Sequence, residues 1–130
     1  MLRLDLMLPV KMMNRKPTRQ SRGPNAAEKK HMAWVNERSI CAACNASGPV
    51  ILHHCEGSTF KSRVGLERVL LGHWFVLGLC QNCDDIVTRR SRRAFREKFG
   101  DQSDLWLIQA ESYPHEIPLS VIQGISNCGR

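Results

Sequence analysis

Two Cys-x-x-Cys pairs carry the clearest chemistry in this chain: Cys41 with Cys44, and Cys80 with Cys83, with 35 residues between the pairs. A two-residue spacing lets both sulfurs of a pair reach one ion, and zinc accepts four thiolates in a tetrahedron. Disulfides or free thiols are the alternative, but paired cysteines at this spacing are more typical of metal ligands. We therefore expect a structural zinc site, because four sulfurs leave no position for a reactive water.

Two adjacent histidines, His53 and His54, follow the apolar run Val50-Ile51-Leu52 in the segment between the cysteine pairs. Neighbouring residues on a strand point to opposite faces, but the backbone can bend where a strand ends, so both rings can reach one cleft. Imidazole suits acid–base work because its pKa lies near neutral pH. This pair is the candidate catalytic centre.

A helix is the first element expected to support these residues. Asn25 is a good N-cap residue and Glu28 lies three positions later, the pattern of a capping box. The helix is predicted to end near Arg38, with Trp34 and Val35 packed on the core.

Apolar runs and turn residues predict the remaining elements. In order, they are a short strand at 50–52, a long loop at 55–72 with one helical turn at 65–71, a buried strand at 73–79, a helix from about 83 to 96, and a last helix at 103–113. These predict an α+β fold organised as a basic flexible arm at 1–24, one zinc-containing domain at 25–113, and a flexible tail at 114–130.

Composition favours a polyanionic partner. The 130 residues include 19 Lys plus Arg and 12 Asp plus Glu, a formal net charge of +7. Basic residues gain free energy when they release counterions from phosphates. A domain this small also buries a modest fraction of its surface, so a structural metal would add useful stability.

The chain is expected to be cytoplasmic, because no apolar run reaches the length of a membrane span. The apolar start is interrupted by Arg3 and Asp5 and has no small-residue cleavage site, so it is not read as a signal peptide.

Basic residues gather in two places that can meet DNA. The helix predicted at 83–96 carries five arginines on its outer face, and the long loop adds two basic residues; the set is Arg89, Arg90, Arg92, Arg93, Arg96, Lys61 and Arg63. Arginine suits phosphate because its guanidinium donates two hydrogen bonds at once. A merely solvated helix face is the alternative.

The order of cysteine pair, strand, His-His, loop, strand, cysteine pair and helix resembles the zinc-containing HNH (ββα-metal) nucleases. More closely, roughly residues 15–107 resemble the Ref-like, RecA-dependent recombination nucleases of phages. The stretches that carry this resemblance are Ala26-Ala27-Glu28-Lys29-Lys30, Cys41-Ala-Ala-Cys44, Leu52-His53-His54, Gly72-His73-Trp74-Phe75-Val76-Leu77-Gly78-Leu79-Cys80, Arg92-Arg93-Ala94-Phe95 and Lys98-Phe99-Gly100.

The resemblance implies a small zinc-stapled HNH domain with flanking helices. His53 would ligate a divalent metal, Mg²⁺ or Mn²⁺, and His54 would be the general base that activates water. It also implies DNA as substrate, a RecA filament as partner, and a phage or prophage protein acting in a bacterial cell.

The sequence departs from that family where a histidine usually completes the metal site. Asp84 stands there instead, and a carboxylate is a good ligand for a hard cation. Asp85 is an alternative, and both acids can instead simply stabilise a helix N-terminus. Thr88 occupies the position of a further family histidine, and His73 can orient the site or be purely structural.

We therefore expect a metal-dependent DNA endonuclease with His53, His54 and Asp84 at its centre. The alternatives are a catalytically degenerate zinc module that binds DNA, and a zinc-organised adaptor that binds other proteins.

Overall fold

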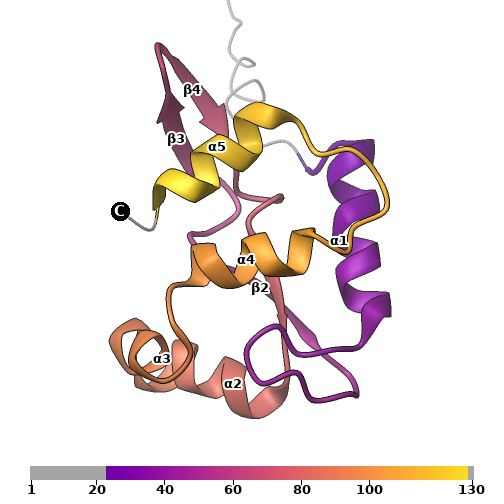
Figure 1. Cartoon of the computed structure of the whole chain (residues 1–130), viewed down its shortest axis with the longest axis vertical. Coiled ribbons are helices and arrows are strands. Elements are labelled where there is room, and N and C mark those ends of the chain that lie inside the picture. The colour runs from indigo at the N-terminus through magenta and orange to yellow at the C-terminus, as the bar shows by residue number, and fades with distance from the viewer. Residues whose placement is uncertain (1–22, 129–130) are drawn as a thin grey trace, which may run out of the picture.

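Two antiparallel strand pairs and a set of helices make an α+β fold within residues 23–128, the part of the chain that this computed structural model describes (Figure 1). The elements are α1 (Ala26–Arg38), β2 (Ile51–His54), β3 (Lys61–Val64), β4 (Glu67–Leu70), β5 (Val76–Leu79), α2 (Gln81–Asp85), the π-helical turn η3 (Ile86–Arg90), α3 (Arg92–Phe99), α4 (Gln102–Ala110) and α5 (Leu119–Cys128). The expected α+β class is confirmed. Most of the arm predicted at 1–24 lies outside the described residues.

Helix α1 begins as its sequence predicts. The Asn25 side chain accepts a hydrogen bond from the Glu28 backbone N–H, and the Glu28 carboxylate accepts one from the Asn25 N–H, each at 2.8 Å. The helix ends at Arg38, where Ser39 adopts a left-handed conformation with φ 54°. A complete capping box satisfies two otherwise unpaired N–H groups and fixes this start.

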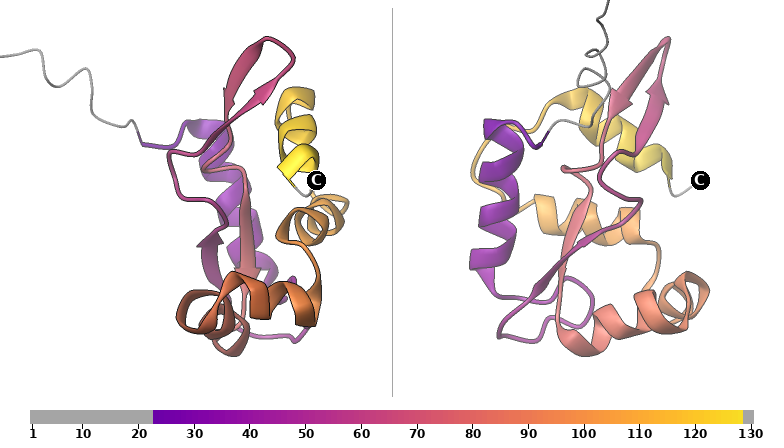
Figure 2. Two further views of the ribbon diagram at one scale, coloured as in Figure 1. Left: turned by 90° about the vertical axis from the view of Figure 1, so that its left-hand side faces the viewer. Right: turned by 180° about the vertical axis from the view of Figure 1, so that it is seen from behind.

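A central ribbon pairs β2 with β5, so that Ile51 lies opposite Leu79 and His54 opposite Val76. All of β5 is buried. Helix α1 contacts both strands and α4 contacts β5, from different sides of the ribbon (Figure 2). The ribbon therefore holds His53 and His54 at the end of a strand anchored within the core.

Side chains of α4 form hydrogen bonds with backbone groups on the edge of β5 that does not pair with β2. The Gln109 amide donates to the Val76 carbonyl at 3.0 Å and accepts from the Gly78 N–H at 3.2 Å. Trp106 Nε1 donates to the Trp74 carbonyl at 2.8 Å. A buried strand edge needs such partners because unpaired backbone groups are costly away from water.

The prediction of a long loop at 55–72 with a helical turn at 65–71 is wrong, because residues 61–70 form the hairpin β3–β4. Gly65, at φ 63°, begins a two-residue turn, a position that glycine adopts without a steric penalty. Gly72 closes the base of the hairpin so tightly that a Cβ there would lie 1.9 Å from the Ser58 carbonyl oxygen. Each strand has only four residues, so its alternation of polar and apolar side chains is too short to distinguish a strand from a helical turn.

The prediction of a single helix from about 83 to 96 is also wrong, because this segment is divided into several helical elements. Helix α2 begins at Gln81, η3 ends at Arg90, and α3 begins at Arg92. Ser91 between them is extended, at φ −175° and ψ 158°, and its hydroxyl accepts from the Ala94 N–H at 2.9 Å. Serine is a strong N-cap residue, and here it starts a new helix.

The tail predicted at 114–130 contains a packed helix, α5. Val121 and Ile125 are buried in the main core, which also includes Leu71 and Trp106. A Cβ on Gly124 would lie 3.0 Å from Leu71 Cδ1, so glycine permits this close approach. The prediction failed because Pro118, Gly124 and Gly129 are typical of an extended tail, whereas this ten-residue helix gains its stability from packing on the core. No helix in residues 23–128 has the length and hydropathy needed to cross a membrane.

Candidate metal centre and adjoining histidines

The four predicted cysteines meet at one point. The sulfurs of Cys41, Cys44, Cys80 and Cys83 all lie within 4.8 Å of one another, and those of Cys44 and Cys80 are 3.8 Å apart. Sulfurs at about 2.3 Å from a tetrahedral zinc ion are about 3.8 Å from each other. The cluster can therefore hold a metal ion such as zinc.

The two cysteine pairs are tied to the ribbon by backbone hydrogen bonds. The first pair lies in a tight turn, where the Cys41 N–H donates to the Ala46 carbonyl and Asn45 has φ 64°. The Ala42 N–H then donates to the Gly78 carbonyl at 2.8 Å, which fixes this turn against β5. The second pair follows β5 directly, because Cys80 is the N-cap of α2.

The pKa values in the cluster show that its thiols do not all ionise together in the absence of a cation. Burial raises the pKa of the Cys41 thiol, but backbone N–H groups of Cys44, Cys80 and Ala43 together lower it to about 7. Burial and the neighbouring thiols raise the pKa of Cys83. Four thiolates cannot share this space without a positive ion, which supplies the compensating charge when it binds.

His53 and Asp84 lie together beside this cluster. His53 Nδ1, at the end of β2, is 3.8 Å from Asp84 Oδ1 on α2, and their side chains are only 13% and 16% exposed. His53 Nε2 lies 3.0 Å from Oε1 of Gln102, the first residue of α4. Burial lowers the pKa of His53, opposed by Gln102 and Asp84, so the ring is held neutral.

His54 points to a different neighbour. Its Nε2 lies 3.3 Å from Nδ1 of His73, with the two rings edge to face at a centroid distance of 5.3 Å. Burial lowers the pKa of His54, and the nearby His73 and His53 lower it further. Near pH 7 this imidazole is therefore neutral, the form that can accept a proton.

The predicted alternative ligand, Asp85, is already engaged on the surface. Its carboxylate lies 3.6 Å from Arg89 Nε and accepts from Gln81 Nε2 at 2.9 Å. The Thr88 hydroxyl donates to the Asp84 carbonyl at 2.7 Å and stays within its helix. Of the two acids, Asp84 is thus the one that faces His53.

Most of the predicted DNA-binding arginines have carboxylate partners. Four ion pairs involve them: Arg89 with Asp85, Arg92 with Glu56 at 2.8 Å, Arg93 with Glu97 at 3.3 Å, and Arg96 with Asp101 at 4.0 Å. Arg90 is exposed and has no ion pair among the described residues. Lys61 and Arg63 lie on β3, away from α3 in sequence and in the fold.

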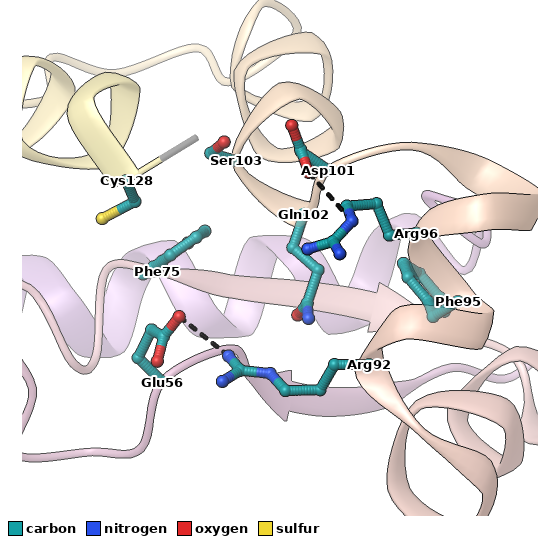
Figure 3. Close-up of a pocket in the computed structure, with 9 residues that line it drawn as sticks. All are labelled: Glu56, Phe75, Arg92, Phe95, Arg96, Asp101, Gln102, Ser103 and Cys128. Atoms are coloured by element: carbon teal, nitrogen blue, oxygen red, sulfur yellow. Dashed lines mark ion pairs between the residues drawn. The ribbon is translucent and has the colours of Figure 1, made fainter. Parts of the chain in front are cut away.

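A pocket of about 190 Å³ is lined in part by Gln102, the residue whose side chain contacts His53 (Figure 3). Gln102 reaches into its centre, with Arg92 and Arg96 approaching it from the side of α3. Its lining residues are Glu56, Phe75, Arg92, Phe95, Arg96, Asp101, Gln102, Ser103 and Cys128. Sequence reasoning missed Gln102, because nothing in the pattern of α4 distinguishes this residue from any exposed glutamine.

Comparison with known proteins finds no match to this chain among protein-family models, curated protein sequences or solved structures.

Proposed function

We propose that this protein is a metal-dependent endonuclease that hydrolyses phosphodiester bonds in DNA, of the zinc-containing HNH class. The observation that carries the proposal is the 3.8 Å separation between His53 Nδ1 and Asp84 Oδ1. Two atoms that each lie about 2.1 Å from one Mg²⁺ are about 3.0 Å apart when adjacent and about 4.2 Å apart when opposite in an octahedron, so a side-chain adjustment of under about 1 Å would let both bind one ion. The element order supports it, since β2 pairs with β5 and α2 follows directly.

Gln102 fixes His53 in the tautomer that can bind a metal through Nδ1. Its Oε1 accepts a hydrogen bond from His53 Nε2–H, which leaves the lone pair of Nδ1 directed toward Asp84. Histidines that bind metals usually donate their other ring N–H in this way. When bound, Mg²⁺ or Mn²⁺ would neutralise the charge that develops on the scissile phosphate.

His54 supplies the general base. When His54 Nε2–H donates to His73 Nδ1, the other ring nitrogen of His54 keeps its lone pair. That nitrogen takes a proton from a water molecule as the water oxygen bonds to phosphorus and the bond to the leaving oxygen breaks. The lowered pKa of His54 keeps the base unprotonated at neutral pH.

A non-catalytic zinc module that binds DNA is the second candidate. It is favoured by one observation: among the described residues, only the four cysteines form a cluster of three or more side chains that could hold a metal ion. His53 and Asp84 thus supply two protein ligands, and Thr88 adds none because its hydroxyl is turned to the Asp84 carbonyl.

The test is cleavage of labelled single- and double-stranded DNA with Mg²⁺ or Mn²⁺. Because the motifs resemble Ref-like nucleases, the assay is run with and without RecA and ATP. We expect His54→Ala and Asp84→Asn each to lower the rate at least about a hundredfold. Asp85→Asn, one residue along and paired with Arg89, is the matched control and should cut normally.

The alternatives give distinct results. A folded, zinc-loaded protein that binds DNA but cuts none of these substrates is the degenerate module. Equal losses in Asp84→Asn and Asp85→Asn would remove the proposed role of Asp84. A strict need for RecA would support action on RecA-coated DNA during phage recombination.

A further inference from the structure

The hairpin β3–β4 projects beyond the rest of the domain, with α5 beside its base (Figures 1 and 2). Its register places Arg63 directly opposite Arg68, and Lys61 opposite Leu70. Residues two apart on a strand share a face, so Lys61, Arg63 and Arg68 all lie on one face of the ribbon. All three side chains are exposed.

The other face of the ribbon packs on the protein. Ser62, Val64 and Val69 are partly buried there. A Cβ on Gly124 of α5 would lie 3.3 Å from Val64 Cγ2, so this face contacts α5. The hairpin is therefore held in one orientation, with its basic face turned away from the domain.

The basic face has no partner within residues 23–128. Four of the helix arginines pair with carboxylates, whereas Lys61, Arg63 and Arg68 form no ion pair there. Two like charges directly opposite each other on neighbouring strands destabilise a ribbon. The Arg63–Arg68 pair thus lowers the stability of the free protein, and a bound anion would relieve the repulsion between the two guanidinium groups.

An apolar side chain occupies the tip of the same hairpin. Leu66, the second residue of the turn, is 96% exposed, the most exposed of the large hydrophobic residues described. Turns normally carry polar residues or glycine at such positions. The hairpin therefore presents a basic flat face that ends in a projecting apolar residue.

We propose that the β3–β4 hairpin binds duplex DNA, with Arg63 and Arg68 on backbone phosphates and Leu66 in the groove between them. The identity of the anion as DNA rests on the proposed function. A two-stranded ribbon fits the major groove, and guanidinium groups match phosphate oxygens. An apolar tip would contact base edges or thymine methyl groups between the phosphate contacts.

The test is binding of a fluorescently labelled duplex, measured by anisotropy at several salt concentrations without added Mg²⁺ or Mn²⁺. The main variant is Arg63→Gln with Arg68→Gln. The matched control, Lys29→Gln with Lys30→Gln, removes the same charge from exposed positions on α1. A third variant, Leu66→Ser, removes only the apolar tip.

Each lost phosphate contact should lower affinity about tenfold near 0.1 M salt and reduce the slope of log K against log salt by about 0.9. The double arginine variant should show both effects, while its melting temperature stays unchanged or rises because the like-charge pair is gone. Leu66→Ser should weaken binding severalfold without changing the slope, because its contact carries no charge.

Several results would overturn the proposal: no binding of duplex, equal affinity for duplex and single strand, or equal losses in the arginine and lysine double variants. These results are separable from the nuclease proposal. Hairpin-dependent binding without cleavage under any condition would refute only the nuclease. Normal cleavage and binding by the double arginine variant would refute only the role of the hairpin.

Discussion

The amide oxygen of Gln102 lies 3.0 Å from Nε2 of His53, although the two residues are 49 positions apart in the chain. Helix α4 begins at Gln102, so the start of this helix sets the orientation of a ring on β2. The hydrogen bond leaves His53 Nδ1 facing Asp84, and Gln102 is thus a positioning residue for the proposed metal site.

Removing this hydrogen bond should weaken metal binding more than it slows the chemical step. We expect Gln102→Ala to raise the Mn²⁺ concentration needed for half-saturation about ten- to a hundredfold. Mn²⁺ binding can be followed by electron paramagnetic resonance, independently of cleavage. Gln102→Glu keeps an acceptor and should restore binding, and the exposed Gln123→Ala on α5 is the control. Unchanged Mn²⁺ affinity in Gln102→Ala would remove its positioning role.

The cysteine cluster should hold one zinc ion per chain in the protein as purified. We expect Cys44→Ser to lose the ion and to melt at a clearly lower temperature, because a structural zinc contributes directly to folding. Cys128 lies outside the cluster, so the Cys128→Ser variant should keep one zinc ion per chain. Elemental analysis and thermal unfolding check both; full zinc content in Cys44→Ser would contradict this assignment.

His31 should make folding stability depend on pH. Its ring is completely buried, its two nitrogens have no hydrogen-bond partner within residues 23–128, and burial lowers its pKa from 6.5 to about 4. Between these values the unfolded chain binds more protons, so this contribution to stability is complete above about pH 6.5 and is lost as pH falls toward 4. The shift corresponds to roughly 3 kcal/mol.

The measurement is urea unfolding at several pH values between 4 and 7. His31→Phe, which suits the surrounding rings of Trp74 and Tyr113, should flatten the pH dependence. Replacing the exposed His115 with Gln is the control. A profile for His31→Phe as steep as that of the unmodified protein would show that other groups cause the dependence.

Helix α5 should contribute substantially to stability. Ile125 is fully buried, and Ile125→Ala should lower the free energy of unfolding by about 2–5 kcal/mol. Leu119 on the same helix is 67% exposed, and Leu119→Ala should cost less than about 0.5 kcal/mol. Denaturant unfolding compares the two. Similar small losses would show that α5 is weakly attached.

The sequence alone determined the features that depend on local chemistry. The Asn25–Glu28 capping box located the start of α1, because both partners lie within one helical turn. The spacing within each Cys-x-x-Cys pair identified the four cysteines of the cluster that could hold a metal ion, since two residues between cysteines bring both sulfurs to one point. The apolar run before His53 likewise predicted the strand that carries it.

Only the tertiary structure decided the features that depend on contacts between distant segments. The pairing of His53 with Gln102 and the choice of Asp84 over Asp85 follow from how α2 and α4 pack around β2. Helix α5 and the hairpin β3–β4 gain stability from each other and from the core, which no short-range pattern records. Local signals fix where an element can begin, whereas packing determines which side chains it brings together.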